Sequence, residues 1–306
     1  MSNTILAGRL PTVQKNSGVE HLARSLRPCG WGDLRIAMLT AYFDGSGHEA
    51  DHPVLVVGGF ISSAEDWALF EPQWLQRLAQ ERLEYLHVSE INGRNRQCRM
   101  HDDCSDHWTI RRRSALFQDL IKIIRLVAYR KFACIVVNRS FSEMSPDVRR
   151  EFYLNAYSLA GRTCAARVRE FIFSQWNDRL SPELIFEKGD RGHGKLIDRF
   201  EADGLGTPIF KSGRGRIEKD GLITKGLLPL QAADLFAYIV FDMMREYERS
   251  GSIEYSSEYL ALNSLPTDTL ILSPTDLDRL PNELAAITES IESLRRASTS
   301  RSRPQS

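Results

Sequence analysis

Three acidic residues stand at positions that favour a chemical role. Asp44 ends a β-rich segment and is followed by Gly45 and Gly47, and Glu187 ends a second such segment, with Asp190 shortly after it. Ligands of open α/β sheets gather beyond the carboxyl ends of strands, so these acids are candidate site residues. Each pattern alone also fits a turn, because Asp and Gly are common turn residues.

Asp234 gives the strongest physical argument. It is the one charged residue in the apolar stretch from Leu227 to Val240, which predicts a buried helix. Burying an unpaired carboxylate costs on the order of several kcal/mol, so Asp234 needs a partner or a cation. Gln231 and Tyr238 share its helix face. A loop that Asp234 caps, or a buried arginine, would satisfy the carboxylate as well as a metal ion.

These acids meet if the strands ending at Asp44 and Glu187 are parallel neighbours and the Asp234 helix crosses the sheet. Facing carboxylates raise one another's pKa values unless a cation neutralises them. Hard oxygen ligands favour Mg²⁺ or Mn²⁺. Such sites often hold two ions about 4 Å apart, which activate a water and stabilise a leaving oxygen in phosphoryl transfer. We therefore expect Asp44, Glu187 and Asp234 to bind Mg²⁺ or Mn²⁺.

A glycine-interrupted basic segment precedes the Asp234 helix and could hold a phosphate backbone beside the metal. An exposed loop whose charges only interact with solvent fits equally well. The basic residues of this segment are Lys211, Arg214, Arg216, Lys219 and Lys225.

The elements that must position these residues follow from periodicity. A hairpin is expected from 39–44 and 54–61, with further strands at 132–137 and 184–187, and helices at 65–82, 111–129, 149–173 and 230–244. Trp67, Phe70 and Trp74 recur at helical spacing and predict core packing. An early hairpin followed by alternating strands and helices predicts an α/β fold, with a mixed sheet flanked by helices.

Composition limits the classes of function. Forty basic and forty acidic residues cancel over 306 residues, which excludes a protein that coats nucleic acid by bulk charge. We expect a loose extension over 1–37, a single domain over 38–290 and a disordered Ser/Arg tail over 291–306. Translation could start at Met1 or Met38. The absence of a signal peptide or apolar span and the five scattered cysteines predict a cytoplasmic protein without membrane contact.

Two groups of histidines and cysteines have weaker claims. The ligand types of Cys98, His101, Cys104 and His107 suit zinc, but their spacing is tighter than in structural zinc sites, which favours an ordinary polar loop. His48 and His52 follow the first acid in the sequence. They could reach a metal, although solvated loop positions are the simpler interpretation.

Several motifs together resemble one family. They are the segment from Tyr42 to Gly47, the apolar strand with Gly58 and Gly59, the stretch from Leu86 to Ile91, and the helix around Asp234. The chain is similar over about 39–245 to the bacterial and phage-associated "domain of unknown function 3800" family.

This resemblance implies a ribonuclease H-like core and a metal-dependent nuclease-type site. Asp44, Glu187 and Asp234 would take the acidic roles, with Asp190 as a substitute or fourth acid. His87 and Glu90 match a family motif of unassigned role. The first motif of the family often carries a glutamate where this chain has Gly45, so a possible supporting carboxylate is missing.

The leading hypothesis is a Mg²⁺- or Mn²⁺-dependent nuclease that hydrolyses DNA or RNA. One alternative is a non-catalytic ribonuclease H-like module that binds nucleic acid or protein. Another is an enzyme acting on a small phosphorylated molecule. The sequence does not fix the oligomeric state.

Overall fold

The computed structural model describes residues 39–92, 108–152, 154–176, 181–217, 223–224, 226–272 and 275–279, together with Val19 and Asn282. The side chains of Asn92 and of residues 216–225 lie outside this description. The expected tail over 291–306, the Cys/His group at 98–107 and all of the expected extension except Val19 also fall outside it.

A six-stranded mixed sheet forms the centre of the fold, in the order β5-β4-β1-β2-β3-β8. Strand β2 runs antiparallel to β1 and β3, whereas the pairs β1–β4, β4–β5 and β3–β8 are parallel. The strands are β1 (Leu39–Ser46), β2 (Val54–Ser63), β3 (Arg130–Val137), β4 (Glu183–Glu187), β5 (Ile209–Lys211) and β8 (Thr267–Leu272). Strands β6 (Arg216–Ile217) and β7 (Ile223–Thr224) form a separate two-stranded sheet.

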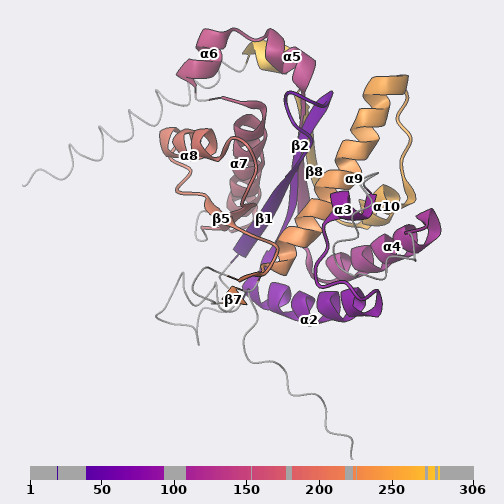
Figure 1. Ribbon diagram of the computed structural model, residues 1–306. Helices are drawn as coiled ribbons and strands as arrows, with labels where there is room; N and C mark the ends of the chain where they lie inside the picture. Colours follow the sequence, from indigo (N-terminus) through magenta and orange to yellow (C-terminus); the bar gives the residue numbers. More distant parts are fainter. Residues whose placement is uncertain are drawn as a thin grey trace, which may run out of the picture.

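Helices cover both faces of the sheet (Figure 1). On one face lie α7 (Ala156–Trp176) and α8 (His193–Ala202). On the other, α9 (Leu228–Ser250) packs on β1 and β2, and α2 (Ala64–Gln80) and α4 (Ile110–Val127) pack beside it. Further short helices are α3 (Val88–Asn92), α5 (Asn138–Glu143), α6 (Pro146–Glu151), α10 (Ser257–Ala261) and the 3₁₀ turn η2 (Leu262–Ser264), and residues 275–279 are helical as well. The expected α/β fold with a mixed, helix-flanked sheet is confirmed, and it is consistent with a ribonuclease H-like architecture.

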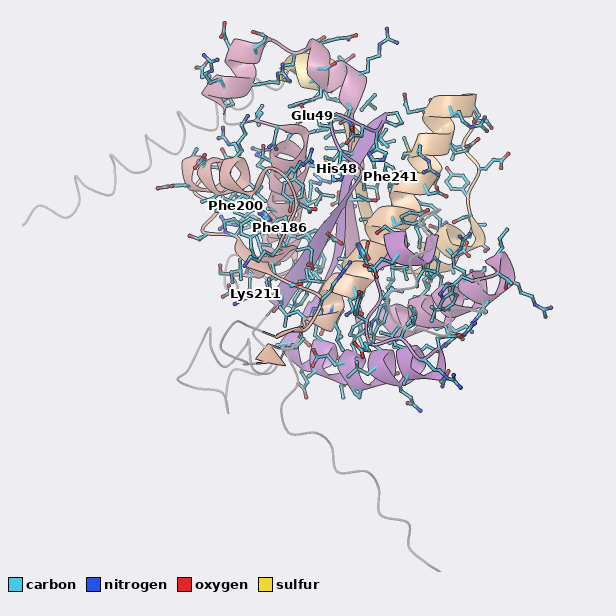
Figure 2. All side chains as sticks on the ribbon, viewed as in Figure 1. His48, Glu49, Phe186, Phe200, Lys211 and Phe241 are labelled. Atoms are coloured by element: carbon cyan, nitrogen blue, oxygen red, sulfur yellow. The ribbon has the colours of Figure 1, made fainter. Side chains whose placement is uncertain are left out.

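Strand alternation divides the core into two layers. Tyr42 and Ile185 pack towards α9, whereas Phe43 and Phe186 stack on each other in the layer of α7 and α8. Figure 2 shows Phe186 and Phe200 on the α7–α8 side and Phe241 on the α9 side. Residues of even number in β1, including Asp44, therefore face α9.

The tryptophan-rich helix is a core element, as expected. Trp67, Phe70 and Trp74 of α2 are fully buried. Ser63 caps the helix by accepting a hydrogen bond from the N–H of Asp66 at 3.0 Å. These aromatic residues hold α2 against the layer that contains α9.

The single helix expected over 149–173 is wrong. The chain forms α6, which ends at Glu151, and a separate α7, which begins at Ala156. Asn155 and Ser158 cap the second helix reciprocally: the N–H of Ser158 donates to Asn155 Oδ1 at 2.6 Å, and the N–H of Asn155 donates to Ser158 Oγ at 2.9 Å. This capping pair starts a new helix where the apolar spacing alone continues the old one.

Within the described ranges, no helix is long and apolar enough to cross a membrane.

Candidate carboxylate site

Two of the acids stand at the ends of neighbouring parallel strands. Phe43 of β1 pairs with Phe186 of β4, and Asp44 and Glu187 follow directly. Both acids have the strand parity of Tyr42 and Ile185, so they lie on the α9 side of the sheet. The parallel arrangement on which the metal-site hypothesis depended is therefore present.

Helix α9 crosses the sheet beside Asp44. Gly58 of β2 is the register partner of Asp44. A Cβ atom on Gly58 would lie 3.2 Å from the Cα of Ala237, so backbone meets backbone at this point. Asp234 lies one helical turn before Ala237, which brings it towards the end of β1. The absence of a side chain at Gly58 permits this close approach.

The pKa values of Asp44, Glu187 and Asp190 are raised by burial and by the charges of neighbouring acids, Asp234 among them. Burial, and then the charges of Asp234, Asp190 and Glu187, raise the pKa of Asp44 well above its usual value. Burial is also the main cause that raises the pKa of Glu187, and Asp234 adds to it, although a hydrogen bond from Gly213 opposes the shift. Burial and the Glu187 charge raise the pKa of Asp190 to about 7. Four carboxylates, including Asp190, therefore form the site.

Gly45 makes room for Asp190. A Cβ atom on Gly45 would lie 2.7 Å from Asp190 Oδ2 and 3.1 Å from a ring carbon of Tyr157. Asp190 Oδ2 and the Tyr157 hydroxyl are both buried, and hydrogen bonding from that hydroxyl and from the Gly45 N–H partly offsets the rise in the pKa of Asp190. Burial, followed by the charges of Asp190 and Asp44, raises the pKa of Tyr157 well above its usual value, so the hydroxyl stays protonated. The site thus contains a buried carboxylate oxygen next to a buried, protonated hydroxyl.

Asp234 is held by the turn that starts α3. Its Oδ2 atom accepts a hydrogen bond from the N–H of Val88 at 2.9 Å and lies 3.2 Å from Nδ1 of His87. Ser89 Oγ lies 2.8 Å from His87 Nε2. His87 therefore belongs to the site through Asp234. The alternative in which Asp234 caps a loop is also realised, because the carboxylate receives the first N–H of α3.

Glu90 does not join the other acids. Its carboxylate lies 3.0 Å from Nη1 of Arg214 and accepts a hydrogen bond from the Tyr85 hydroxyl at 3.0 Å. The glutamate of the His87–Glu90 motif therefore binds the basic segment instead of the carboxylates.

The basic segment is described only in part. Lys211 is exposed at the end of β5 (Figure 2), and Arg214 is partly exposed. The Gly213 N–H between them donates to Glu187 Oε2 at 2.7 Å, which ties this segment to the site. The side chains of Arg216, Lys219 and Lys225 lie outside the described residues.

The Gln231 side chain links three separate segments of the protein by hydrogen bonds, a role that the sequence did not predict. Its Oε1 accepts hydrogen bonds from Trp74 Nε1 and from the N–H of Leu86, both at 2.9 Å, and its Nε2 donates to the Gly213 carbonyl at 2.7 Å. This side chain joins α2, α9 and the segments on either side of the acids. Nothing in the sequence around Tyr157 marks it as a site residue, and Ser89 is recognisable there only as a neighbour of Glu90 in the segment from Leu86 to Ile91.

The two loop histidines differ. His48 is exposed, as expected for a loop residue. His52 is half-buried, and its ring lies edge-on to Phe241 with 5.2 Å between ring centres. Neither His48 nor His52 places its imidazole ring among the four acids.

The oxygens of the four carboxylates suit a hard divalent cation. The side chains are not, however, in the positions that metal ligands would take. Among the residues that the structure describes, no three His, Cys, Asp or Glu side chains form a group that could hold a metal ion. The repulsion among these four carboxylates, of which Asp44 and the Oδ2 atom of Asp190 are buried, is what a cation would relieve. Binding requires rotations that bring the oxygens to about 2.0–2.2 Å from the ion.

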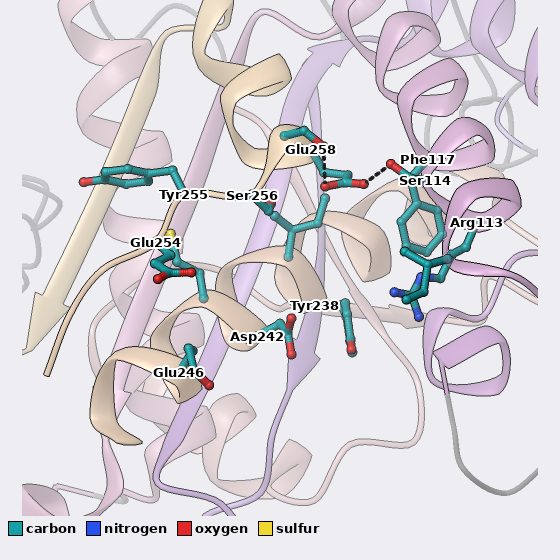
Figure 3. Close-up of a pocket in the computed structure, with 14 residues that line it drawn as sticks. Arg113, Ser114, Phe117, Tyr238, Asp242, Glu246, Glu254, Tyr255, Ser256 and Glu258 are labelled. Atoms are coloured by element: carbon teal, nitrogen blue, oxygen red, sulfur yellow. Dashed lines mark hydrogen bonds between the residues drawn. The ribbon is translucent and has the colours of Figure 1, made fainter. Parts of the chain in front are cut away.

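A separate groove of about 440 Å³ lies between α4, the second half of α9 and residues 254–258 (Figure 3). Several of its acidic side chains have partners in the protein: Glu258 accepts from Ser114 at 2.6 Å, and Asp242 and Glu246 pair with Arg245 and Arg249. The groove contains none of the four site carboxylates.

Comparisons of the chain with protein-family models, with curated proteins and with solved structures found no match. The family resemblance therefore stays a prediction from the motifs, and the site must be interpreted from its own geometry.

Proposed function

We propose that the protein is a Mg²⁺- or Mn²⁺-dependent nuclease that hydrolyses phosphodiester bonds of DNA or RNA. The observation that carries this proposal is the convergence of Asp44, Glu187, Asp190 and Asp234: the charges of the other three raise the pKa of Asp44, and the Asp234 charge also raises the pKa values of Glu187 and Asp190. Such a cluster is unfavourable without a cation, because each ionised carboxylate opposes the next. Binding of a divalent ion would reduce this repulsion and so stabilise the folded protein.

Each part of the site has a role in this proposal. Asp44 and Glu187 would hold the ion from the strand ends, Asp190 from the turn beyond β4, and Asp234 from α9. A bound Mg²⁺ or Mn²⁺ would lower the pKa of a water and stabilise the leaving oxygen. His87 and the N–H of Val88 orient the Asp234 carboxylate, and the protonated Tyr157 hydroxyl can donate a hydrogen bond beside Asp190.

The direct test is cleavage of labelled single- and double-stranded DNA and RNA by the purified protein with Mn²⁺. Asp44→Asn keeps the side-chain shape but removes one charge, and we expect it to reduce the rate by at least about 100-fold. The matched control is Asp242→Asn, which changes an exposed aspartate of α9 and should cleave like the wild type. Equal rates for Asp44→Asn and the wild type would contradict the site. Binding of nucleic acid without any cleavage would instead favour the non-catalytic module.

A further inference from the structure

The backbone of Arg214 is fixed beside the carboxylates. The preceding residue, Gly213, donates its N–H to Glu187 Oε2 at 2.7 Å and accepts a hydrogen bond from Gln231 at 2.7 Å. The N–H of Arg214 itself donates to Ser212 Oγ at 3.1 Å. The residue directly before Arg214 is therefore hydrogen-bonded to a site carboxylate.

The guanidinium of Arg214 is held by two partly exposed side chains. Its Nη1 lies 3.0 Å from Glu90 Oε1, and its central carbon lies 4.7 Å from the centre of the Tyr85 ring. The Tyr85 hydroxyl donates to the other oxygen of Glu90 at 3.0 Å. The side chains of Arg214 and Glu90 are 38% and 37% exposed, so solvent screens the pair and it adds little to stability.

Glu90 occupies a position that suits a phosphate. A guanidinium recognises the oxygens of a carboxylate and of a phosphate with the same planar donor geometry. Stacking on Tyr85 keeps that plane fixed while the partner changes. Because the ion pair is exposed and contributes little to stability, an incoming anion can replace Glu90 at low cost.

We propose that Arg214 and Tyr85 form a phosphate subsite for a nucleic-acid strand and that Glu90 is an internal competitor which the strand displaces. The subsite would take a phosphodiester group close to the one at the carboxylates. This proposal rests on the proposed function, since it assumes a nucleic-acid substrate. It assigns Glu90 the opposite effect from that of a catalytic acid, because removing its charge should strengthen binding.

Binding can be measured by fluorescence anisotropy with labelled oligonucleotides of DNA and of RNA in Mn²⁺ buffer, with Asp44→Asn as the background so that no strand is cut. Glu90→Gln should tighten binding by about three- to tenfold, because the competing charge is gone. Arg214→Ala should weaken it by about tenfold. Glu246→Gln is the matched control: it removes an acid paired with an arginine on α9 and changes the net charge equally.

A double-mutant cycle makes the test specific. In the Arg214→Ala background, Glu90→Gln should give no more tightening than Glu246→Gln, because the competitor then has no cation to release. Tyr85→Phe keeps the stacked ring but removes the hydroxyl that holds Glu90, so it should tighten binding by about twofold.

The proposal is overturned if Glu90→Gln and Glu246→Gln bind equally, or if the gain persists without Arg214. It is also overturned if no variant binds an oligonucleotide. Failure of the subsite proposal can be distinguished from failure of the proposed nuclease function. If the wild type cleaves but Glu90→Gln binds with unchanged affinity, only the subsite proposal is contradicted. If the affinities change as expected but no protein cleaves, only the proposed catalysis is contradicted.

Discussion

At Asp190 a carboxylate oxygen is buried against Gly45. The absence of a side chain at Gly45 leaves the space that Asp190 fills. Gly45 and Asp190 are therefore best understood together: the chain places an acid from the turn after β4 beside the position where a side chain on β1 would lie.

The raised pKa of Asp190 predicts a specific pH dependence. Its ordinary value is 3.8, and its value in the folded protein is about 7. Between these values the folded state binds more protons than the unfolded state, so the stability from the protonated group is fully present at low pH and is lost as the pH rises through about 7. In metal-free protein, Asp190→Asn should gain stability over the wild type on the order of 2 kcal/mol from pH 5 to pH 7, and the gain should then level off. Urea unfolding in EDTA measures it, and a constant difference at all pH values would contradict the assignment.

His87 is a positioning residue, because it acts through Asp234. Its Nδ1 and the N–H of Val88 both contact Asp234 Oδ2, and Ser89 contacts the other ring nitrogen. We expect His87→Ala to weaken Mn²⁺ binding by about tenfold. His87→Asn places an amide near the Nδ1 position and should restore part of the affinity. Calorimetric titration of both variants tests this, and wild-type affinity in His87→Ala would rule out the positioning role.

At the level of single residues, the sequence predicted which acids come together but not which groups contact and position them. Asp44, Glu187 and Asp234 were identifiable because each carries a charge at a strand end or within an apolar helix. Tyr157, Gly213 and Ser89 have no such signal, because their roles depend on contacts between segments far apart in the chain.

Helix α9 is the element that completes the site. Its close approach to β2 depends on Gly58, where a Cβ atom would lie 3.2 Å from the Ala237 backbone and from the Phe236 side chain. A larger side chain at this position would push the α9 backbone away from the sheet. Because much of α9 is buried, this movement would disturb the packing of the helix. Separation of α9 from the sheet would also move Asp234 away from Asp44.

Gly58→Val should therefore destabilise the protein by about 1–3 kcal/mol and weaken Mn²⁺ binding. Gly194 in α8 gives the matched control, because a Cβ atom there meets nothing within 4 Å. Gly194→Ala should leave stability unchanged or raise it by up to about 1 kcal/mol. Urea denaturation measures both changes. Equal stability of Gly58→Val and Gly194→Ala would show that the sheet and α9 are not in close contact.

Apolar periodicity predicted the hairpin, the central strands and the buried helix, because each has a sustained pattern. It failed after Glu151, the last residue of α6, because the capping pair of Asn155 and Ser158 starts α7 as a new helix. It gave no prediction for β8, whose residues are mostly exposed at the sheet edge. The position of β8 depends on pairing with β3, which is remote in sequence.

Across the whole molecule, charge is balanced: forty basic residues offset forty acidic ones. Four carboxylates in one place are therefore a local concentration of charge and not a consequence of an acidic chain. Strand binding would depend on a few cations such as Arg214 and should be moderate and sensitive to salt. A divalent ion would neutralise the centre and allow a phosphodiester to approach it.

The most direct test of the account is calorimetric titration of the metal-free protein with Mn²⁺, comparing the wild type with Asp234→Asn and Asp242→Asn. These two aspartates lie on the same helix, but only Asp234 raises the pKa values of Asp44 and Glu187. The account predicts saturable binding by the wild type and by Asp242→Asn, and an affinity at least about tenfold lower for Asp234→Asn. No saturable binding by the wild type, or equal binding by Asp234→Asn, would contradict it.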